Sequence, residues 1–242
     1  RRRAQRALYS DVESAAAAVA RLMAQPVTPS MLEFMDGDCV RLAREVGGAD
    51  LPPAGALLMI EADGDDAVLD AAVAALSAAA RGPGCLDVTS APDDAAREQL
   101  WAARKALSPA LRTLAPGKIN EDVVVPVSRI PDLVAAVRRA AAAEALTIVC
   151  FGHAGNGNLH VNILYDPAQA DQVTRADAAL ESVFDAVIAL GGQVSGEHGI
   201  GLVKRELLVR SLTPATVAMM RAIKSQFDPD GLLNPGKVLP PA

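Results

Sequence analysis

The sequence is poor in residues that mark several protein classes: among its 242 residues it has only three histidines, three cysteines and no long hydrophobic run. No segment approaches the roughly 20 apolar residues that a membrane-spanning helix needs. The odd number and wide spacing of Cys39, Cys85 and Cys150 argue against a disulfide framework or a thiolate zinc site. We therefore expect buried free thiols and a cytoplasmic protein, which partner subunits would bring to a membrane surface.

Positive charge is also scarce, since 23 Lys and Arg stand against 29 Asp and Glu and the formal net charge is −6. Nucleic acids and anionic membranes bind to surfaces with an excess of basic residues, so neither is an expected partner. The one basic run, Arg1-Arg2-Arg3, is interpreted as a solvated terminus or a linker remnant. The chain begins without Met or a signal-peptide pattern, and we expect a piece of a longer protein.

What is present is the composition of a globular protein, with 51% hydrophobic and 21% charged residues and no repeat of solenoid length. Short apolar runs alternate with Ala-rich helical stretches, and no linker divides them, so one domain is expected. Strands are predicted at 31–35, 56–61, 85–89, 119–125, 147–152 and 159–165. Helices are predicted at 10–24, 64–80, 94–114, 169–190, 204–209 and 214–227, with one more ending at 144.

A Gly-Asn-Gly-Asn sequence decides between a parallel and an antiparallel sheet. It separates the β-rich runs 147–152 and 159–165, and so short a connection between two strands indicates a hairpin. We therefore predict an α+β fold with a mostly antiparallel sheet and helices packed on one face.

The first cluster of polar residues surrounds this hairpin, in the sequence GHAGNGNLHVN at 152–162. His153 and His160 are expected to lie opposite each other across the hairpin. Asn158, His160 and Asn162 are spaced by two and so share a sheet face. Two imidazoles would then converge on one small molecule. For a single histidine an ordinary core or surface role would be the better interpretation, but the pair favours a functional one.

The second cluster is SGEHGIG at 195–201, which follows a long predicted helix. Taken alone it could be a helix end followed by a loop that needs glycine. Together with the first cluster it adds Glu197 as an oxygen ligand. Two histidines and a carboxylate form a familiar site for Zn²⁺ or Mn²⁺ with an open position for substrate. His198 is then free to act as a base.

An acidic substrate also needs a cation. Arg104 and Ser108 lie one helical turn apart on a predicted helix, where the guanidinium could hold a carboxylate in bidentate fashion. Lys118 and Asn120, just before a strand, would add a second anchor. For each of these residues alone, a solvated helix face or strand edge is an equally good interpretation.

Three motifs in this order, GHAGNGNLHVN, SGEHGIG and FDPDGLLNPGKVL, resemble the C-terminal domain of FAD-linked oxidases that act on 2-hydroxy acids. That family includes the glycolate oxidase flavin subunit, D-lactate dehydrogenase and D-2-hydroxyglutarate dehydrogenase. The resemblance covers nearly the whole chain, since the segment 9–35 with Glu33 and Asp36 looks like the start of that domain. It implies a cap domain derived from a ferredoxin-like fold.

The resemblance also implies a role for each matching residue. The divalent metal, Zn or Mn, would be bound by His153, His160 and Glu197, and His198 would be the base that removes the hydroxyl proton as hydride leaves for the flavin. The remaining matches are Arg104, Ser108, Asn162 and, more loosely, Lys118 for the substrate carboxylate, and Asn234 and Lys237 for a tail that lies near FAD.

One feature of the family is missing. Its FAD is held mainly by an N-terminal domain with a Gly-rich phosphate-binding loop, and neither that loop nor a GxGxxG motif occurs here. Residues 1–242 are therefore expected to be the substrate-binding portion of a flavoenzyme, inactive alone. Its expected partners are a 2-hydroxy acid, an FAD-binding domain or subunit and an electron-acceptor protein. The alternatives are a non-catalytic metal or small-molecule binding module and, less favoured, a flavin-free metallohydrolase.

Overall fold

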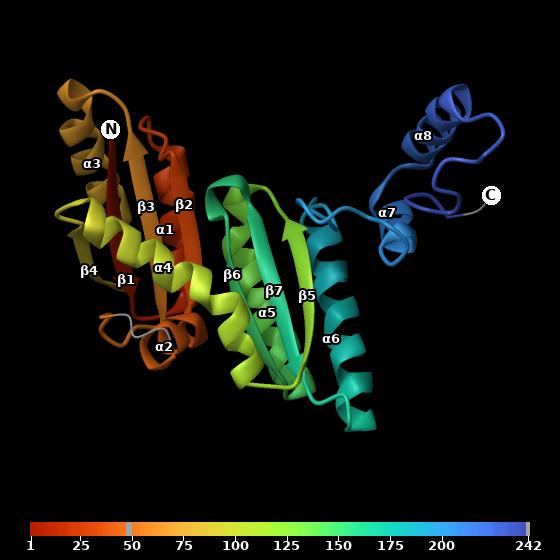
Figure 1. Ribbon diagram of the computed structural model, residues 1–242, viewed down its shortest axis with the longest axis horizontal. Coiled ribbons are helices and arrows are strands. Elements are labelled where there is room, and N and C mark those ends of the chain that lie inside the picture. The colour runs from red at the N-terminus through yellow and green to blue at the C-terminus, as the bar shows by residue number, and fades with distance from the viewer. Residues whose placement is uncertain (47–49, 241–242) are drawn as a thin grey trace.

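The structure, a computed structural model, describes residues 1–46 and 50–240, without the side chains at 103, 105, 106, 108 and 109. Its centre is a seven-stranded sheet with the strand order β4-β1-β3-β2-β6-β7-β5 (Figure 1). Every neighbouring pair of strands is antiparallel, which confirms the predicted α+β class. The strands are β1 (Arg2–Tyr9), β2 (Met31–Asp36), β3 (Ala56–Asp63), β4 (Cys85–Ser90), β5 (Gly117–Val124), β6 (Thr147–Gly152) and β7 (Asn158–Tyr165).

Four helices form the predicted layer on one face of this sheet, and two further helices, which the sequence did not predict there, cover the other face. The helices are α1 (Val12–Ala24), α2 (Gly37–Glu45), α3 (Asp66–Ala80), α4 (Asp94–Ala110), α5 (Ile130–Glu144), α6 (Ala170–Ala189), α7 (Arg205–Ser211) and α8 (Pro214–Phe227), with 3₁₀ turns at Leu111–Thr113, Val127–Arg129 and Ala154–Asn156. The larger core joins α1, α3, α5 and α6 to the sheet, and a second core lies under α2 and α4. Strand β3 alternates between them, with Leu58 and Ile60 in the first and Leu57 and Met59 in the second, which explains its continuous apolar run.

The order of elements shows two ferredoxin-like units side by side. The first, from β1 to β4, has the strand order 4-1-3-2 and the β-α-β-β-α-β pattern, with α2 inserted. The second, from β5 to α6, repeats this arrangement with three strands. Beside β5, where a fourth strand would lie, the described residues contain only an isolated bridge between Val124 and Gln193. The segment after α6 therefore runs along the edge of β5.

Strand β1 corrects the interpretation of the N-terminal arginines as a linker remnant. Arg2 and Arg3 belong to β1, which pairs with β3 over its whole length and with β4 on its other side. The arginine side chains are exposed, as expected, but Ala7, Leu8 and Tyr9 are buried. The basic run concealed the strand because its apolar half is only three residues long. Two of the three free cysteines, Cys39 and Cys150, are buried as predicted, and Cys85 is partly exposed.

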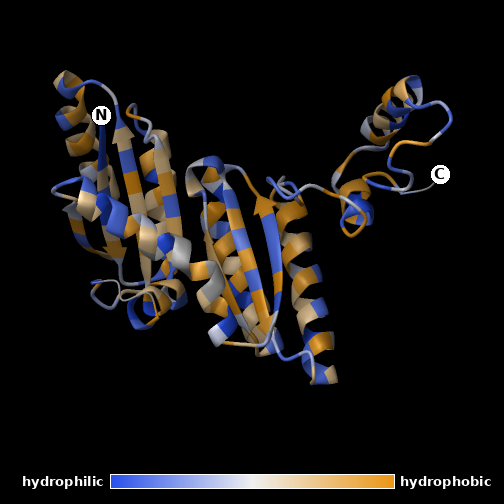
Figure 2. Ribbon diagram, viewed as in Figure 1, coloured by the Kyte–Doolittle hydropathy of each residue, from blue (hydrophilic) through white to orange (hydrophobic). Residues whose placement is uncertain are grey.

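The second unit carries polar residues on the sheet face opposite the larger core. Along β7, Leu159 and Val161 enter the larger core, while His160 and Asn162 point to the opposite face. Figure 2 shows this alternation of hydrophobic and hydrophilic residues along β7. No helix in the described part of the chain is long and apolar enough to cross a membrane.

Asp36 joins the two units where strand pairing is weakest. Strands β2 and β6 pair only through Phe34 with Gly152 and Met35 with Phe151. Just beyond, the Asp36 carboxylate accepts the backbone N–H groups of Cys150, on β6, and of Cys39, at the start of α2. Burial outweighs these hydrogen bonds and raises the pKa of Asp36 to about 6.

This raised pKa predicts a pH-dependent contribution to stability. Between the ordinary pKa of 3.8 and about 6 the folded chain holds a proton on Asp36 that the unfolded chain has lost. The stabilisation is thus complete below pH 4 and disappears by about pH 6, a change of about 3 kcal/mol at 1.36 kcal/mol per pKa unit. In urea unfolding at several pH values, the free energy of unfolding of the wild type should fall by this amount from pH 4 to pH 6 relative to that of Asp36→Asn. A difference that does not vary with pH would contradict the assignment.

Candidate metal and substrate site

His153 and His160 lie on the polar face, at the point where the two units meet. His160, on β7, pairs with Phe151 on β6, so His153 is displaced by two residues from the position directly opposite that the hairpin suggested. The two rings still meet edge to face with their centroids 5.6 Å apart. Burial, reinforced by His153 and Arg104, lowers the pKa of His160. A neutral imidazole is the form that binds a metal ion.

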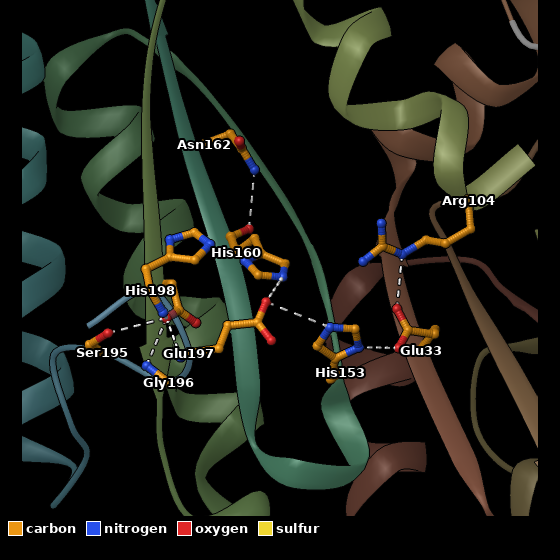
Figure 3. A network of polar contacts seen from close by, with 10 residues as sticks. Glu33, Arg104, His153, His160, Asn162, Ser195, Gly196, Glu197 and His198 are labelled. Carbon is orange, nitrogen blue, oxygen red and sulfur yellow. Dashed lines mark hydrogen bonds and ion pairs between the residues drawn. The ribbon is translucent and has the colours of Figure 1, made fainter.

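Glu197 reaches both histidines from the loop after α6 (Figure 3). Its Oε1 lies 3.5 Å from Nε2 of His160 and 4.0 Å from Nε2 of His153. One ligand atom from each residue lies within 4.8 Å of the others. Ligands at about 2.1 Å from a tetrahedral centre are about 3.4 Å apart, so small movements of the His153 and Glu197 side chains would close this group around an ion. The donor set therefore fits a divalent metal such as Zn²⁺.

Glu33 connects the histidines to Arg104. Its carboxylate, 2% exposed, accepts a hydrogen bond from Nδ1 of His153 at one oxygen and from Nε of Arg104, at 2.9 Å, at the other. Binding Nδ1 in this way leaves Nε2 of His153 directed at Glu197, the arrangement that orients histidine ligands in metal sites. The Arg104 guanidinium lies over the Phe151 ring and points toward the histidines (Figure 3).

His198 stands beside this group. Its ring stacks on His160 with centroids 5.6 Å apart and planes inclined by 22°. The loop that carries it is bound to Asp122 of β5, whose Oδ2 accepts the backbone N–H groups of Gly196, Glu197 and His198. Burial alone would raise the pKa of Asp122, but these hydrogen bonds and the Asn158 side chain together lower it to about 2.

The other predicted substrate residues are less clearly placed. Asn162 is fully buried, and its amide nitrogen donates to the backbone carbonyls of Val149 and His160, at 3.3 Å each. Lys118 lies on the same face of β5, opposite Leu164 and therefore four residue pairs along the strand from His160. Burial, with Arg112 nearby, lowers the pKa of Lys118. The side chain of Ser108 lies outside the described part of the chain.

Asn234 and Lys237, the predicted flavin contacts, lie on the C-terminal tail. Lys237 Nζ is 3.4 Å from Asn234 Oδ1, and both residues are exposed. Figure 1 shows this tail, with α7 and α8, apart from the sheet that carries the histidines. The structure thus assembles the metal and base candidates with Arg104 and does not bring the tail to them.

Sequence reasoning missed two carboxylates that organise the site. The sequence indicates Glu33 only through the family resemblance, and no motif contains Asp122. Each is a charged residue next to apolar strand residues, between Leu32 and Phe34 in one case and before Val123 in the other. A charge at a buried strand position requires a partner, and that requirement was the available signal.

The fold and these side chains define an α+β domain with a candidate metal site beside an arginine. The chain belongs to the family described as FAD linked oxidases, C-terminal domain, whose model matches residues 1–238. This membership confirms the resemblance of the three motifs.

Relatives and solved structures agree with this membership. The chain is 34% identical over 233 residues to glycolate oxidase subunit GlcD of Bacillus subtilis (strain 168), covering 96% of this chain and 50% of that protein. It is 30% identical over 233 residues to a probable mitochondrial D-lactate dehydrogenase of Danio rerio, covering 96% and 47%. The crystal structure of p-cresol methylhydroxylase with substrate bound matches with a TM-score of 0.72 at 14% identity, covering 99% and 53%, and this supports the fold alone. The chain spans about half the length of the curated relatives it matches.

Proposed function

We propose that this chain is the substrate-binding portion of an FAD-dependent dehydrogenase or oxidase of 2-hydroxy acids. The observation that carries the proposal is the convergence of His153, His160 and Glu197 with the base candidate His198 and the cation Arg104 on one polar sheet face. The named activities of the relatives, glycolate oxidase and D-lactate dehydrogenase, support the same substrate class. A third, at 38% identity over 181 residues, is a D-2-hydroxyglutarate dehydrogenase of Xanthomonas citri pv. viticola, of which the chain covers 38%.

The side chains divide the work of oxidising an alcohol. In the proposed reaction the substrate loses its Cα–H as hydride and its O–H as a proton, and a C=O bond forms. His198 accepts the proton, and Arg104 holds the carboxylate and so fixes which face of the Cα atom is presented. Bound FAD supplies the hydride acceptor, and a divalent ion at His153, His160 and Glu197 supplies a Lewis acid to the substrate.

Glu33 links two of these groups, Arg104 and His153, to each other. Because its carboxylate binds both Arg104 and His153, the cation for the substrate and one metal ligand move together. The side chains of Arg104 and Glu33 are 12% and 2% exposed, so little water competes with the ion pair between them. Asn162 and Lys118 lie on the same face of β7 and β5, and Asn162, which is fully buried, binds the strand backbone there.

The C-terminal helix α8 is the part of this chain that we propose contacts the flavin-binding portion of the protein. Its 14 residues include no buried side chain. Met219, Ile223 and Phe227 follow one another at intervals of four, so they form one apolar face, and Phe227 is 82% exposed. Leu232 and Leu233, on the tail that holds Asn234 and Lys237, are exposed as well. The relatives are about twice as long as this chain, so each contains a further portion of about this chain's length.

The proposal predicts that the chain and the intact protein differ completely in activity. The 242 residues supplied with FAD should bind the flavin poorly and give no turnover of glycolate, D-lactate or D-2-hydroxyglutarate. With the same acids under anaerobic conditions, absorption spectra of the intact protein should show reduction of its flavin. Turnover by the isolated chain would contradict the proposed division of the site. An intact protein that binds metal and leaves its flavin oxidised would favour the non-catalytic binding module.

A further inference from the structure

We propose that Asp122 is a positioning residue: it holds the loop at 195–199 so that Glu197 and His198 face the two histidines. This inference rests on the proposed function, because it assigns those two side chains their places in it. Asp122 is fully buried on β5, directly opposite His160 of β7. It is not one of the three residues whose ligand atoms form the candidate metal group.

A single carboxylate oxygen of Asp122 accepts hydrogen bonds from the backbone of the loop. Its Oδ2 lies 2.8 Å from the N of Gly196, 2.6 Å from that of Glu197 and 2.8 Å from that of His198. Ser195 Oγ lies 3.3 Å from the same oxygen and accepts the N–H of Gly199 at 2.8 Å. Three consecutive N–H groups thus point at one carboxylate, and charged acceptors form the strongest hydrogen bonds of this kind.

The loop has little else to hold it in place. Residues 196–199 are all exposed, so apolar packing does not fix them. Gly196 lies so close to β5 and β7 that a Cβ there would approach Asn158 Nδ2 to 2.2 Å and Asp122 Oδ1 to 2.7 Å. The backbone is therefore pressed against Asp122, and the side chains of Glu197 and His198 project from it toward His160.

The neighbouring residue holds the far end of the same segment. β5 is the last strand of the sheet, and Glu121 and Asp122 point to its opposite faces. Nζ of Lys204 lies 2.7 Å from Glu121 Oε2 and donates to the carbonyl of Val194 at 2.9 Å. The segment 193–204 therefore wraps around the edge strand, with Glu121 fixing it on the core side and Asp122 on the side of the site.

The test is the substitution Asp122→Asn in the intact protein, which keeps the size of the side chain and removes its charge. Metal-free protein is titrated with Zn²⁺ in competition with a chromophoric chelator. The Zn²⁺ affinity should fall about 10- to 100-fold, the usual cost of losing a residue that orients a metal ligand. In metal-free protein, hydrogen exchange at the amides of Gly196, Glu197 and His198 should become about tenfold faster or more.

Asp228→Asn is the matched control. Asp228 is also buried and accepts two backbone N–H groups, from Leu232 at 2.8 Å and Leu233 at 2.9 Å, with Lys224 as a further partner, but it holds a different segment. Its substitution should speed exchange at those two amides and leave the Zn²⁺ affinity within about twofold of wild type.

The outcomes separate this inference from the proposed function. Unchanged exchange at residues 196–198 in Asp122→Asn overturns the role of Asp122, whether or not the protein binds metal. A wild type without Zn²⁺ affinity contradicts the proposed metal site, and the exchange measurement still decides the role of Asp122. Should Asp122→Asn fail to fold, Gly196→Ala displaces the loop without a change of charge. The same loss of Zn²⁺ affinity is then expected, and wild-type affinity overturns the inference.

Discussion

Replacing His198 by Gln in the intact protein is expected to lower kcat for its 2-hydroxy acid about 100-fold or more, which is the usual contribution of a general base. The loop should survive the change, because its link to Asp122 uses the backbone N–H of residue 198 and the side chain is exposed. Gln can still donate a hydrogen bond to a substrate oxygen, but it cannot accept the hydroxyl proton near neutral pH. The loss should therefore appear in kcat more than in KM.

The rate of anaerobic flavin reduction in a stopped-flow instrument measures this step directly. Metal content and urea midpoint equal to those of the wild type provide the control, since they show that the neighbouring group is intact. A reduction rate within about threefold of wild type would remove His198 from the mechanism and leave the proton to another acceptor.

Replacing both His153 and His160 by Ala is expected to cost still more. A Lewis acid at a reacting oxygen contributes several kcal/mol to the transition state, and at 1.36 kcal/mol per tenfold this corresponds to about 10³-fold in kcat/KM. Because metal ligands act as one unit, His160→Ala alone should lose nearly as much as the double variant. His153→Ala has a second effect, since it also removes the partner that shares Glu33 with Arg104.

Steady-state kinetics at saturating and limiting concentrations of the 2-hydroxy acid give kcat and kcat/KM and so test this expectation. The matched control is Asn156→Ala in the turn between the histidines, whose side chain belongs to neither the metal group nor the polar contacts of Figure 3. It should leave kcat/KM within a few-fold of wild type. Additive losses from the two single variants would argue against a shared metal ion.

Local signals in the sequence predicted much of the fold. The Gly-Asn-Gly-Asn turn correctly predicted an antiparallel pair at β6 and β7, and capping and Pro signals placed α1 and α8 close to their observed ends. β1 was missed because its arginines resemble a terminus, and α2 because its N-cap, Asp36, is also the last residue of β2. The face covered by α2 and α4 could not be read from periodicity, since β3 is apolar on both sides.

The residues of the site likewise differ in whether a local sequence pattern predicts them. Residues within one motif, such as His153 and His160, or Glu197 and His198, could be found because their spacing places them together. Glu33 meets His153 across 120 residues, and Asp122 meets Glu197 across 75, so each contact depends on the pairing of strands distant in sequence. Such contacts follow from topology, which no local pattern encodes.

Elemental analysis of the intact protein is the most direct test of the central claim, that His153, His160 and Glu197 together bind a divalent metal. The account predicts about one equivalent of Zn²⁺ or Mn²⁺ per chain in wild-type protein purified without chelator. It predicts none in the variant with both histidines replaced by Ala. Equal metal content in the two proteins, including none in either, would contradict it and leave the three side chains as direct hydrogen-bonding groups for the substrate.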